Sequence, residues 1–378
     1  MEYLRKLQIS REGKSAFLFG PRLTGKTYLL KHTFPDAKYY DLLRSDTFLR
    51  LSIRPSVFRE ELEALEEGST VIVDEIQKLP VLLDEIHLLI EERGLRFLMT
   101  GSSARKLRRG GVNLLGGRAR MLRLHPLVSS EIGDFDLLKA LTIGTLPSIY
   151  DSSEAWEDLK AYCGVYLQEE IAAEGAARKL DAFARFLHSA ALFSGEQVNY
   201  EAWGSDALVP SRTVREYFYM LSDTLLGEML EPWRKGKKRK PAASGKFYFF
   251  DIGVRNALAG IRTLSPGTAE FGKALEHLIY NELRAWLDYS RDDRALSFWR
   301  TTDGKEVDFM VGDDLAIEVK SAEFPDHRDL KGLIALAEEG SFRHRILVCQ
   351  SPAPRMVEGI EIWPIKEFLI RLWQNAYA

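Results

Sequence analysis

The residues with the most specific chemistry lie near the start of the chain, in the stretch GPRLTGKT. This stretch fits G-x-x-x-x-G-K-[ST] at every fixed position. Its glycines allow a tight turn that brings main-chain N–H groups close to phosphate oxygens. An ordinary glycine-rich turn is the alternative, but the full match predicts a site for ATP or ADP with Mg²⁺. The residues of this predicted site are Gly20, Pro21, Arg22, Leu23, Thr24, Gly25, Lys26, Thr27 and the following Tyr28.

Each polar group of the stretch has an expected task. We expect Lys26 to reach the β- and γ-phosphates and Thr27 to offer its hydroxyl to Mg²⁺. Two acids, Asp74 and Glu75, follow a second apolar run in TVIVDE. We expect Asp74 to bind the metal, usually through water, and Glu75 to orient or activate the attacking water. Such a pair is also typical of a helix N-terminus, but its place one helix–strand unit after the turn favours catalysis.

Two further groups are candidates for contacts with the nucleotide. Ser102, in TGSS, is expected to sense the γ-phosphate or the water, with a plain turn as the alternative. Arg118, with Arg120 in GGRAR, is a candidate for the arginine that stabilises transition-state charge, while a solvated or DNA-facing basic loop explains it equally well. An arginine acting in trans would require an oligomer, so the oligomeric state stays open.

These residues need a sheet that positions them. Short apolar or aromatic runs at 16–19, 38–40, 71–73 and 97–99 alternate in several places with charged segments of helical period. This alternation predicts an α/β domain with parallel strands covered by helices, and the phosphate turn between the first strand and its helix. We place this domain at 1–135, followed by a helical and winged-helix domain at 136–255 and a second α/β domain at 256–378.

The middle domain is expected to end in a winged helix-turn-helix. Ser211 is a good N-cap, and the helix after it has one apolar face. Strand-like runs at 229–233 and 246–250 flank residues 234–240, of which six of seven are basic. This segment predicts contacts with DNA phosphates, against the alternative of a solvated loop. The residues of the apolar face are Val214, Tyr217, Phe218 and Leu221.

Composition limits the class of protein. The chain has 378 residues, 46% of them hydrophobic, and a net charge of −3, so any attraction to nucleic acid must come from local patches. No segment approaches the roughly 18 apolar residues of a membrane helix, so we expect no membrane partner. Cys163 and Cys349 stand far apart and form no CxxC pair. They are typical of a reducing cytosol, so a cytoplasmic location is expected.

The chain resembles a widespread family of bacterial and archaeal AAA-type ATPases that stand near the STAND-like branch of P-loop proteins. The resemblance covers nearly the whole chain. It implies an ATPase domain followed by a C-terminal domain of restriction-endonuclease-like fold. The stretches that carry it are GPRLTGKTYLL, VIVDEIQKLP, LMTGSSARKL, GGRARMLRLHPL, GTLPSIY, KFYFFDIGVRNAL and residues 271–320.

The C-terminal carboxylates resemble the metal site of PD-(D/E)XK nucleases. Glu318 and Lys320 are two residues apart and share a face of a strand. Asp308 is expected on the neighbouring strand and Glu276 on the preceding helix, with Glu306 and Glu282 as alternates. By this resemblance Glu276, Asp308 and Glu318 bind Mg²⁺, and Lys320 positions the water or offsets developing charge. A solvated edge with salt-bridged charges is the alternative.

Two functions follow from these expectations. In the first, the nucleotide state controls a DNA-binding, Mg²⁺-dependent nuclease-like domain. In the second, the protein is a nucleotide-controlled switch or a regulator that binds DNA or protein, and the nuclease-like domain is inactive.

Overall fold

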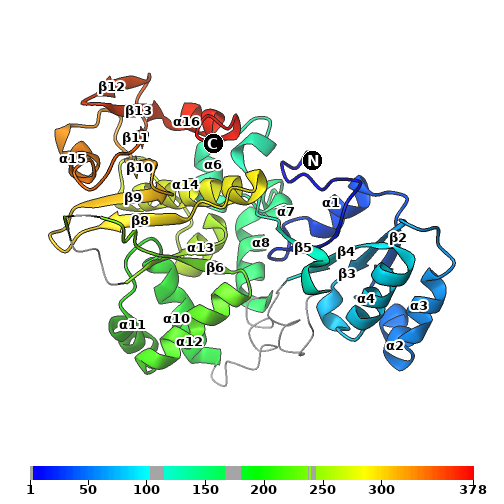
Figure 1. Ribbon diagram of the computed structural model, residues 1–378. Helices are drawn as coiled ribbons and strands as arrows, with labels where there is room; N and C mark the ends of the chain where they lie inside the picture. Colours follow the sequence, from blue (N-terminus) through cyan, green and yellow to red (C-terminus); the bar gives the residue numbers. More distant parts are fainter. Residues whose placement is uncertain (1–2, 103–114, 167–179, 237, 240–243) are drawn as a thin grey trace. The chain divides into compact units, whose positions relative to one another are not determined.

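The protein folds into two compact units. The structure is a computed structural model, and it describes residues 3–102, 115–166, 180–236, 238–239 and 244–378 (Figure 1). The first unit comprises residues 5–126 with 223–226, and the second comprises residues 127–222 and 227–378 with the first residues of the chain. We call the first the nucleotide unit, because the predicted nucleotide-binding turn lies in it, and the second the C-terminal unit.

A five-stranded sheet forms the centre of the nucleotide unit. Its order is β2-β3-β4-β1-β5 and every neighbouring pair is parallel, which confirms the predicted parallel sheet. The edge strand β5 was not predicted, because its residues ARMLR are charged and partly exposed. The strands are β1 (Ser15–Phe19), β2 (Lys38–Asp41), β3 (Thr70–Asp74), β4 (Arg96–Gly101) and β5 (Ala119–Arg123).

Helices cover this sheet and bury an aromatic core. Phe17, Phe58 and Phe97 are fully buried between the strands and helices. α1 begins at Lys26, directly after the phosphate turn, so the predicted strand–turn–helix unit is confirmed. The helices of this unit are α1 (Lys26–Thr33), α2 (Ser45–Ile53), α3 (Ser56–Leu62), α4 (Leu82–Arg93) and the 3₁₀ turns η1 (Ile76–Lys78) and η2 (Leu115–Gly117).

The C-terminal unit begins with short helices that pack against α13. Asp251 caps α13 and also accepts a hydrogen bond from the Thr145 main chain, at 3.0 Å to Val254 N and 2.9 Å to Thr145 N. Asn256 donates to the carbonyls of Leu141 and Thr142. The elements are η3 (Ser129–Glu131), α6 (Leu137–Ile143), α7 (Pro147–Tyr150), α8 (Ala155–Ala161), η4 (Tyr162–Tyr166) and α13 (Ile252–Ala259).

Three helices and a two-stranded antiparallel sheet follow one another in the middle of the chain. The predicted buried face of α12 is confirmed, since Val214, Tyr217, Phe218 and Leu221 are all buried. The prediction that Ser211 caps this helix is wrong: Ser211 is already helical, and the first main-chain bonds run to the Pro210 carbonyl. The elements are α10 (Leu180–Leu192), α11 (Tyr200–Ala207), α12 (Ser211–Asp223), β6 (Gly227–Leu230) and β7 (Lys246–Phe249).

A six-stranded mixed sheet forms the rest of the C-terminal unit, in the order β12-β13-β11-β10-β9-β8. The predicted sequence of a helix, three strands, a helix and a strand is confirmed. The last three elements, β12, β13 and α16, were not predicted. The elements are α14 (Ala269–Ser290), β8 (Leu296–Arg300), β9 (Glu306–Val311), β10 (Leu315–Val319), α15 (His327–Leu336), β11 (His344–Cys349), β12 (Arg355–Val357), β13 (Ile360–Pro364) and α16 (Ile365–Trp373).

Alternation along β10 gives this sheet two cores. Leu315, Ile317 and Val319 pack with α14 and α16, whereas Ala316 packs with α15 on the opposite face. Glu318 follows Ala316 with period two, so its carboxylate lies on the α15 face.

Candidate functional site

The lysine of the phosphate turn is hydrogen-bonded to main-chain carbonyls of the same turn. Lys26 Nζ donates to the carbonyls of Gly20 at 2.8 Å and Pro21 at 3.0 Å. Gly25 has φ 92°, a left-handed conformation that glycine adopts without strain. At Gly20 a Cβ would stand 2.4 Å from the Leu124 carbonyl oxygen, so a side chain does not fit there. Arg22, Leu23 and Tyr28 of the predicted site are exposed.

Arg5 is hydrogen-bonded to the backbone of this turn, and the sequence analysis did not identify it. Its buried guanidinium donates to the Thr24 carbonyl at 2.6 Å and to the His125 carbonyl at 2.6 Å. Thr24 is fully buried, and its hydroxyl donates to the Pro21 carbonyl at 2.9 Å. An arginine can bridge two backbone segments because its planar group carries five donors.

Asp74 is the meeting point of three hydroxyl groups. At the end of β3 it accepts from Thr27 Oγ1 at 2.8 Å and from Tyr39 Oη at 2.6 Å, and Thr100 Oγ1 is a third donor. The predicted pairing of the phosphate turn with the acid of β3 is therefore present in the geometry. Tyr39 was missed because its partner lies on a neighbouring strand, and only the strand order reveals this. Burial and the Asp74 carboxylate raise the pKa of Tyr39, so it remains a donor.

Glu75 lies directly after Asp74 in a left-handed conformation, with φ 59°. Such backbone is rare for a side-chain-bearing residue and costs on the order of 1 kcal/mol or more, and it occurs often at functional sites. Its main-chain N–H donates to Thr100 Oγ1 at 3.0 Å. Gln77 Nε2 donates to the Glu75 carboxylate and lies 3.4 Å from the Ser102 hydroxyl. Ser102 therefore contacts the group that orients Glu75.

The structure places Arg118 away from this site. It precedes β5, whose first residue pairs with Ser15 at the start of β1, whereas the phosphate turn follows the end of β1. Arg118 forms an ion pair with Glu91 and lines a cavity of about 500 Å³ with Lys14 and Arg96. The prediction that Arg118 contacts the nucleotide is therefore wrong for the site of its own chain, because opposite ends of parallel strands lie at opposite edges of a sheet.

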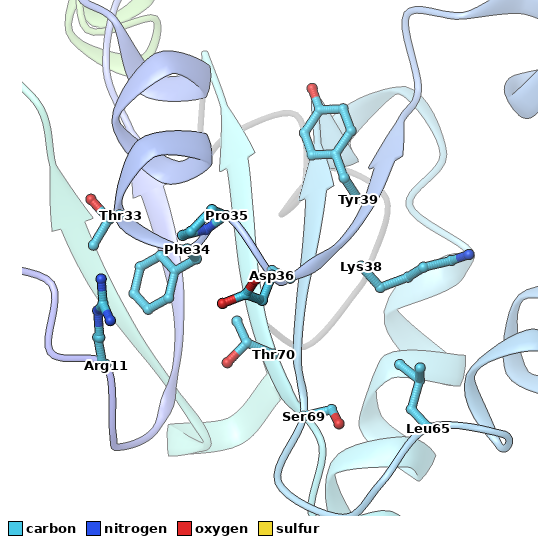
Figure 2. A pocket seen from close by; sticks show the side chains of 11 residues that line it. Arg11, Thr33, Phe34, Pro35, Asp36, Lys38, Tyr39, Leu65, Ser69 and Thr70 are labelled. Atoms are coloured by element: carbon cyan, nitrogen blue, oxygen red, sulfur yellow. The ribbon is translucent and has the colours of Figure 1, made fainter.

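A cavity of about 600 Å³ also lies at the amino ends of the strands, below α1 (Figure 2). Lys38 and Thr70, the first residues of β2 and β3, line it together with Arg11 and Phe34. Tyr39 is shared between this cavity and the cluster of hydroxyls around Asp74. No residue from Gly20 to Tyr28 lines it, so it is distinct from the phosphate turn.

The C-terminal unit brings together four acidic side chains, Glu276, Glu306, Asp308 and Glu318, which we call the carboxylate cluster. Lys246 of β7 lies among them with its side chain only 3% exposed. Its Nζ is 3.0 Å from Glu276 Oε1, 2.7 Å from Glu306 Oε1 and 3.8 Å from Asp308 Oδ1. Sequence reasoning missed Lys246, because β7 precedes the first strand of the carboxylate sheet by some fifty residues and belongs to another sheet.

Two further contacts belong to the carboxylate cluster. Lys320 Nζ donates to Glu318 Oε1 at 2.5 Å, which confirms that the two side chains point the same way. Asp308 Oδ2 accepts from the Val319 main chain at 2.8 Å. Glu282, an alternate for this site, lies elsewhere and binds Ser129 and Trp373.

The carboxylate cluster in this arrangement does not fit a divalent metal ion. Within the described part of the chain, no group of three or more His, Cys, Asp or Glu side chains is placed to hold one. A metal would need carboxylate oxygens directed at one point, and the Lys246 ammonium takes that position for Glu276, Glu306 and Asp308. The expected metal ligands Glu276, Asp308 and Glu318 are thus close together, but an ammonium holds the first two.

Burial shapes the protonation of this cluster. Burial, together with Glu318 and Glu276, raises the pKa of Asp308 well above its usual range. Burial also raises the pKa of Glu318 to about 7, although Lys320 opposes the shift. Burial alone would lower the pKa of Lys246, but the surrounding acids keep that pKa above its ordinary value, so the side chain is an ammonium.

The basic segment at 234–240 is engaged in part with acids of its own chain. Lys235 pairs with Asp313 at 2.6 Å. Arg239 pairs with Glu338 at 2.8 Å and with the buried Glu339 at 2.7 Å. Lys237 and Lys240 lie outside the described residues. Lys235 and Arg239 are therefore ion-paired within the C-terminal unit, which neither the predicted DNA contact nor the alternative of a solvated loop included.

Comparisons with known proteins assign the first third of the chain. A family model described as an AAA domain matches residues 12–133. Two models described as domains of unknown function, DUF8612 and DUF4143, match residues 134–265 and 271–368. No curated protein matches the chain.

The chain also matches the crystal structure of a STAND (Signal Transduction ATPase with Numerous Domains) protein with a tetratricopeptide repeat sensor from Pyrococcus horikoshii. That match has 16% identity and a TM-score of 0.22, and it covers 75% of this chain and 47% of that chain. No helix among the described residues is long and apolar enough to cross a membrane. The match at residues 12–133, the parallel sheet and the predicted phosphate turn agree with one another: this part of the chain is similar to an AAA domain.

Proposed function

We propose that the nucleotide unit binds ATP or ADP with Mg²⁺ at the turn from Gly20 to Thr27 and hydrolyses ATP. The observation that carries this proposal is the 2.8 Å hydrogen bond between Thr27 Oγ1 and Asp74 Oδ2. It joins the hydroxyl of the phosphate turn to the acid of the neighbouring motif, the two groups that hold Mg²⁺ in P-loop enzymes.

These two oxygens fit the metal, since Mg²⁺ is usually bound by one or two protein groups beside phosphates and water. When bound, Mg²⁺ neutralises charge on the phosphate oxygens. The chain's own residues supply the rest. The N-terminus of α1 and the loop N–H groups bind the polyphosphate, and Lys26 exchanges its contacts with the Gly20 and Pro21 carbonyls for phosphate oxygens. Glu75, held by Gln77, orients the attacking water.

Calorimetry and phosphate release test this function. We expect the wild-type protein to bind ATP and ADP in the presence of Mg²⁺ and to release phosphate from ATP. Lys26→Ala should lose most of the nucleotide binding and most of the phosphate release, because the change removes the ammonium expected to contact the β- and γ-phosphates. A Lys26→Ala protein that hydrolysed ATP at the normal rate would overturn the proposal.

We further propose that the nucleotide state controls DNA binding by the C-terminal unit, which does not cut DNA. The order α10, α11, α12, β6, β7 is that of a winged helix-turn-helix, whose last helix enters the major groove in DNA-binding proteins. Arg212, Arg215 and Tyr219 lie on the exposed face of α12, and the Arg212 side chain is 90% exposed.

The position of Lys246 favours the non-cleaving alternative over a Mg²⁺-dependent nuclease. A cleaving site needs a metal held by Asp308 and Glu318, with Lys320 beside the attacking water. In the structure, Lys320 binds Glu318 and the ammonium of Lys246 binds Glu276 and Glu306. These ion pairs therefore argue against metal-dependent cleavage.

Two assays test this second function. Digestion of duplex, single-stranded and branched DNA with Mg²⁺ or Mn²⁺ should show no cleavage, and cleavage that disappears in Asp308→Ala would restore the nuclease alternative. Fluorescence anisotropy should show DNA binding that differs between ATP and ADP. Arg212→Gln with Arg215→Gln should weaken binding and reduce the salt slope by about 0.9 for each phosphate that the protein no longer neutralises. An unchanged slope and affinity would exclude α12 as the element that binds DNA.

A further inference from the structure

We propose that Lys246 is the resident cation of the carboxylate cluster: its ammonium replaces a divalent ion, and the cluster becomes a Mg²⁺ or Mn²⁺ site only when that ammonium is removed. The inference deepens the second proposed function, because it states why the C-terminal unit does not cut DNA. It assigns β7 as the strand that supplies this ammonium.

The strand β7 delivers two donors to the same carboxylate. Lys246 and Tyr248 are two residues apart and therefore leave the strand on one side. Lys246 Nζ lies 3.0 Å and Tyr248 Oη 2.5 Å from the same atom, Glu276 Oε1. Tyr248 is fully buried, so both donors are inside the protein. Two donors from one strand on a single carboxylate oxygen hold β7 against α14.

The ammonium joins acids from different elements. Glu276 comes from α14, while Glu306 and Asp308 come from β9. Carboxylates from separate elements that converge on one cation are what a metal site requires. Here the three carboxylates converge on Lys246 Nζ, which lies 3.0 Å from Glu276, 2.7 Å from Glu306 and 3.8 Å from Asp308.

The charges around the cluster show that a cation is needed. Arg300 pairs with Glu306 Oε2 at 3.0 Å and Lys320 pairs with Glu318 Oε1. Glu276 and Asp308 depend on Lys246, since no other Lys or Arg lies within ion-pair distance of either carboxylate among the described residues. Removal of one member of a buried ion pair leaves an uncompensated charge, which strongly destabilises the folded state.

One carboxylate oxygen of the cluster accepts no hydrogen bond. Glu318 is only 6% exposed, and its Oε2 has no hydrogen-bond partner. A buried carboxylate oxygen without a donor is uncommon. Once Lys246 is removed, this oxygen and Asp308 can act as ligands of a divalent ion, which is why we expect such an ion to bind then.

Mn²⁺ uptake by the full-length protein, without nucleotide or DNA, tests the proposal. All proteins carry Thr27→Ala, so that the phosphate turn does not contribute. We expect no Asp308-dependent Mn²⁺ binding in this parent. Addition of Lys246→Gln should create one Mn²⁺ site per chain and make the thermal midpoint rise with Mn²⁺. Further addition of Asp308→Asn should abolish both effects.

Substitution of a second ion-paired lysine tests whether loss of a positive charge alone creates a Mn²⁺ site. Lys273 of α14 pairs with Glu196 at 2.8 Å but is 32% exposed, and Lys273→Gln should create no Mn²⁺ site. The proposal is overturned if the parent itself takes up Mn²⁺ and loses it on Asp308→Asn, a result obtainable even if the Lys246→Gln protein does not fold. It is equally overturned if a folded Lys246→Gln protein gains no site. A DNA-binding failure would leave these outcomes unchanged, so the two proposals fail separately.

Discussion

At the scale of single residues, Asp74 explains why the end of β3 is organised around hydroxyl groups. Thr27, Tyr39 and Thr100 all donate to its two carboxylate oxygens. Such donors orient the acid before any ligand arrives. Glu75, the next residue, keeps a left-handed backbone because Thr100 accepts its N–H and Gln77 donates to its side chain. The conformation of Glu75 is thus set by neighbours on two other segments.

The first prediction concerns Glu75. Glu75→Gln should reduce phosphate release by about 10²-fold or more, since an amide cannot accept the proton of water, and ATP affinity should stay within a few-fold. Initial rates and calorimetry measure both quantities. Glu66→Gln changes an exposed acid of the same unit and serves as the control. An unchanged rate in Glu75→Gln would remove Glu75 from the mechanism.

Glu282 is a buried acid with a structural role. It accepts from Ser129 N at 2.7 Å, Ser129 Oγ at 3.1 Å and Trp373 Nε1 at 2.5 Å, and so joins α14 to η3 and α16. Burial raises the pKa of Glu282 from 4.5 to about 7, and the Glu131 carboxylate adds to the shift. The folded protein therefore binds this proton more tightly than the unfolded chain does.

The second prediction follows from the raised pKa of Glu282. The free energy of unfolding of the wild type should fall as the pH rises from about 4.5 to about 7, by up to about 3 kcal/mol relative to Glu282→Gln. Glutamine does not titrate, so the difference between the two proteins isolates this group. Urea unfolding at several pH values measures it. Parallel stability curves for the two proteins would contradict the assignment.

At the scale of elements, the docking of α13 onto the turn after α6 joins two of the stretches that carried the family resemblance. A Cβ at Gly253 would stand 2.1 Å from the Ile143 carbonyl oxygen. At Gly144 a Cβ would meet the Asp251 carboxylate at 2.1 Å. Gly253 is therefore required by the nearby backbone of Ile143, and Gly144 by the Asp251 carboxylate and by its own φ of 74°.

The third prediction tests this packing. Gly253→Ala should lower the free energy of unfolding by about 1–3 kcal/mol or more, because the added methyl group meets a main-chain atom that cannot move aside. Gly272→Ala, in α14, is the control: its Cβ would lie 3.6 Å from Ser321 Oγ, an ordinary contact. Alanine in place of that helical glycine should stabilise by about 1 kcal/mol. Equal effects of the two changes on chemical unfolding would contradict the packing argument.

At the scale of the whole molecule, the division into two units predicts where nucleotide acts on stability. ATP with Mg²⁺ should stabilise the unit of residues 5–126 by about 2.7 kcal/mol at 100 times the dissociation constant. Hydrogen exchange should slow most in β1, α1 and β3. Lys26→Ala should abolish the effect. Protection confined to the C-terminal unit would place the nucleotide elsewhere.

Much of the nucleotide site was predictable from local pattern. The spacing from Gly20 to Thr27 and the acids after β3 predicted the site, since the tight turn, the strand before it and the helix after it are encoded by adjacent residues. The helix face of α12 and the order of elements from α14 to β11 were predictable for the same reason. The strands β5, β12 and β13 were not, because short, partly charged edge strands have weak periodicity.

The sequence by itself determined the local units: a glycine turn, an acidic strand end, an apolar helix face. Only the tertiary structure decided which groups meet across the chain. Arg5 reaches the His125 carbonyl, Tyr39 reaches Asp74, and Arg118 lies at the opposite edge of its sheet. Lys246 of β7 binds carboxylates of α14 and of β9, a strand of another sheet. These pairings depend on strand order and packing, which spacing along the chain does not specify.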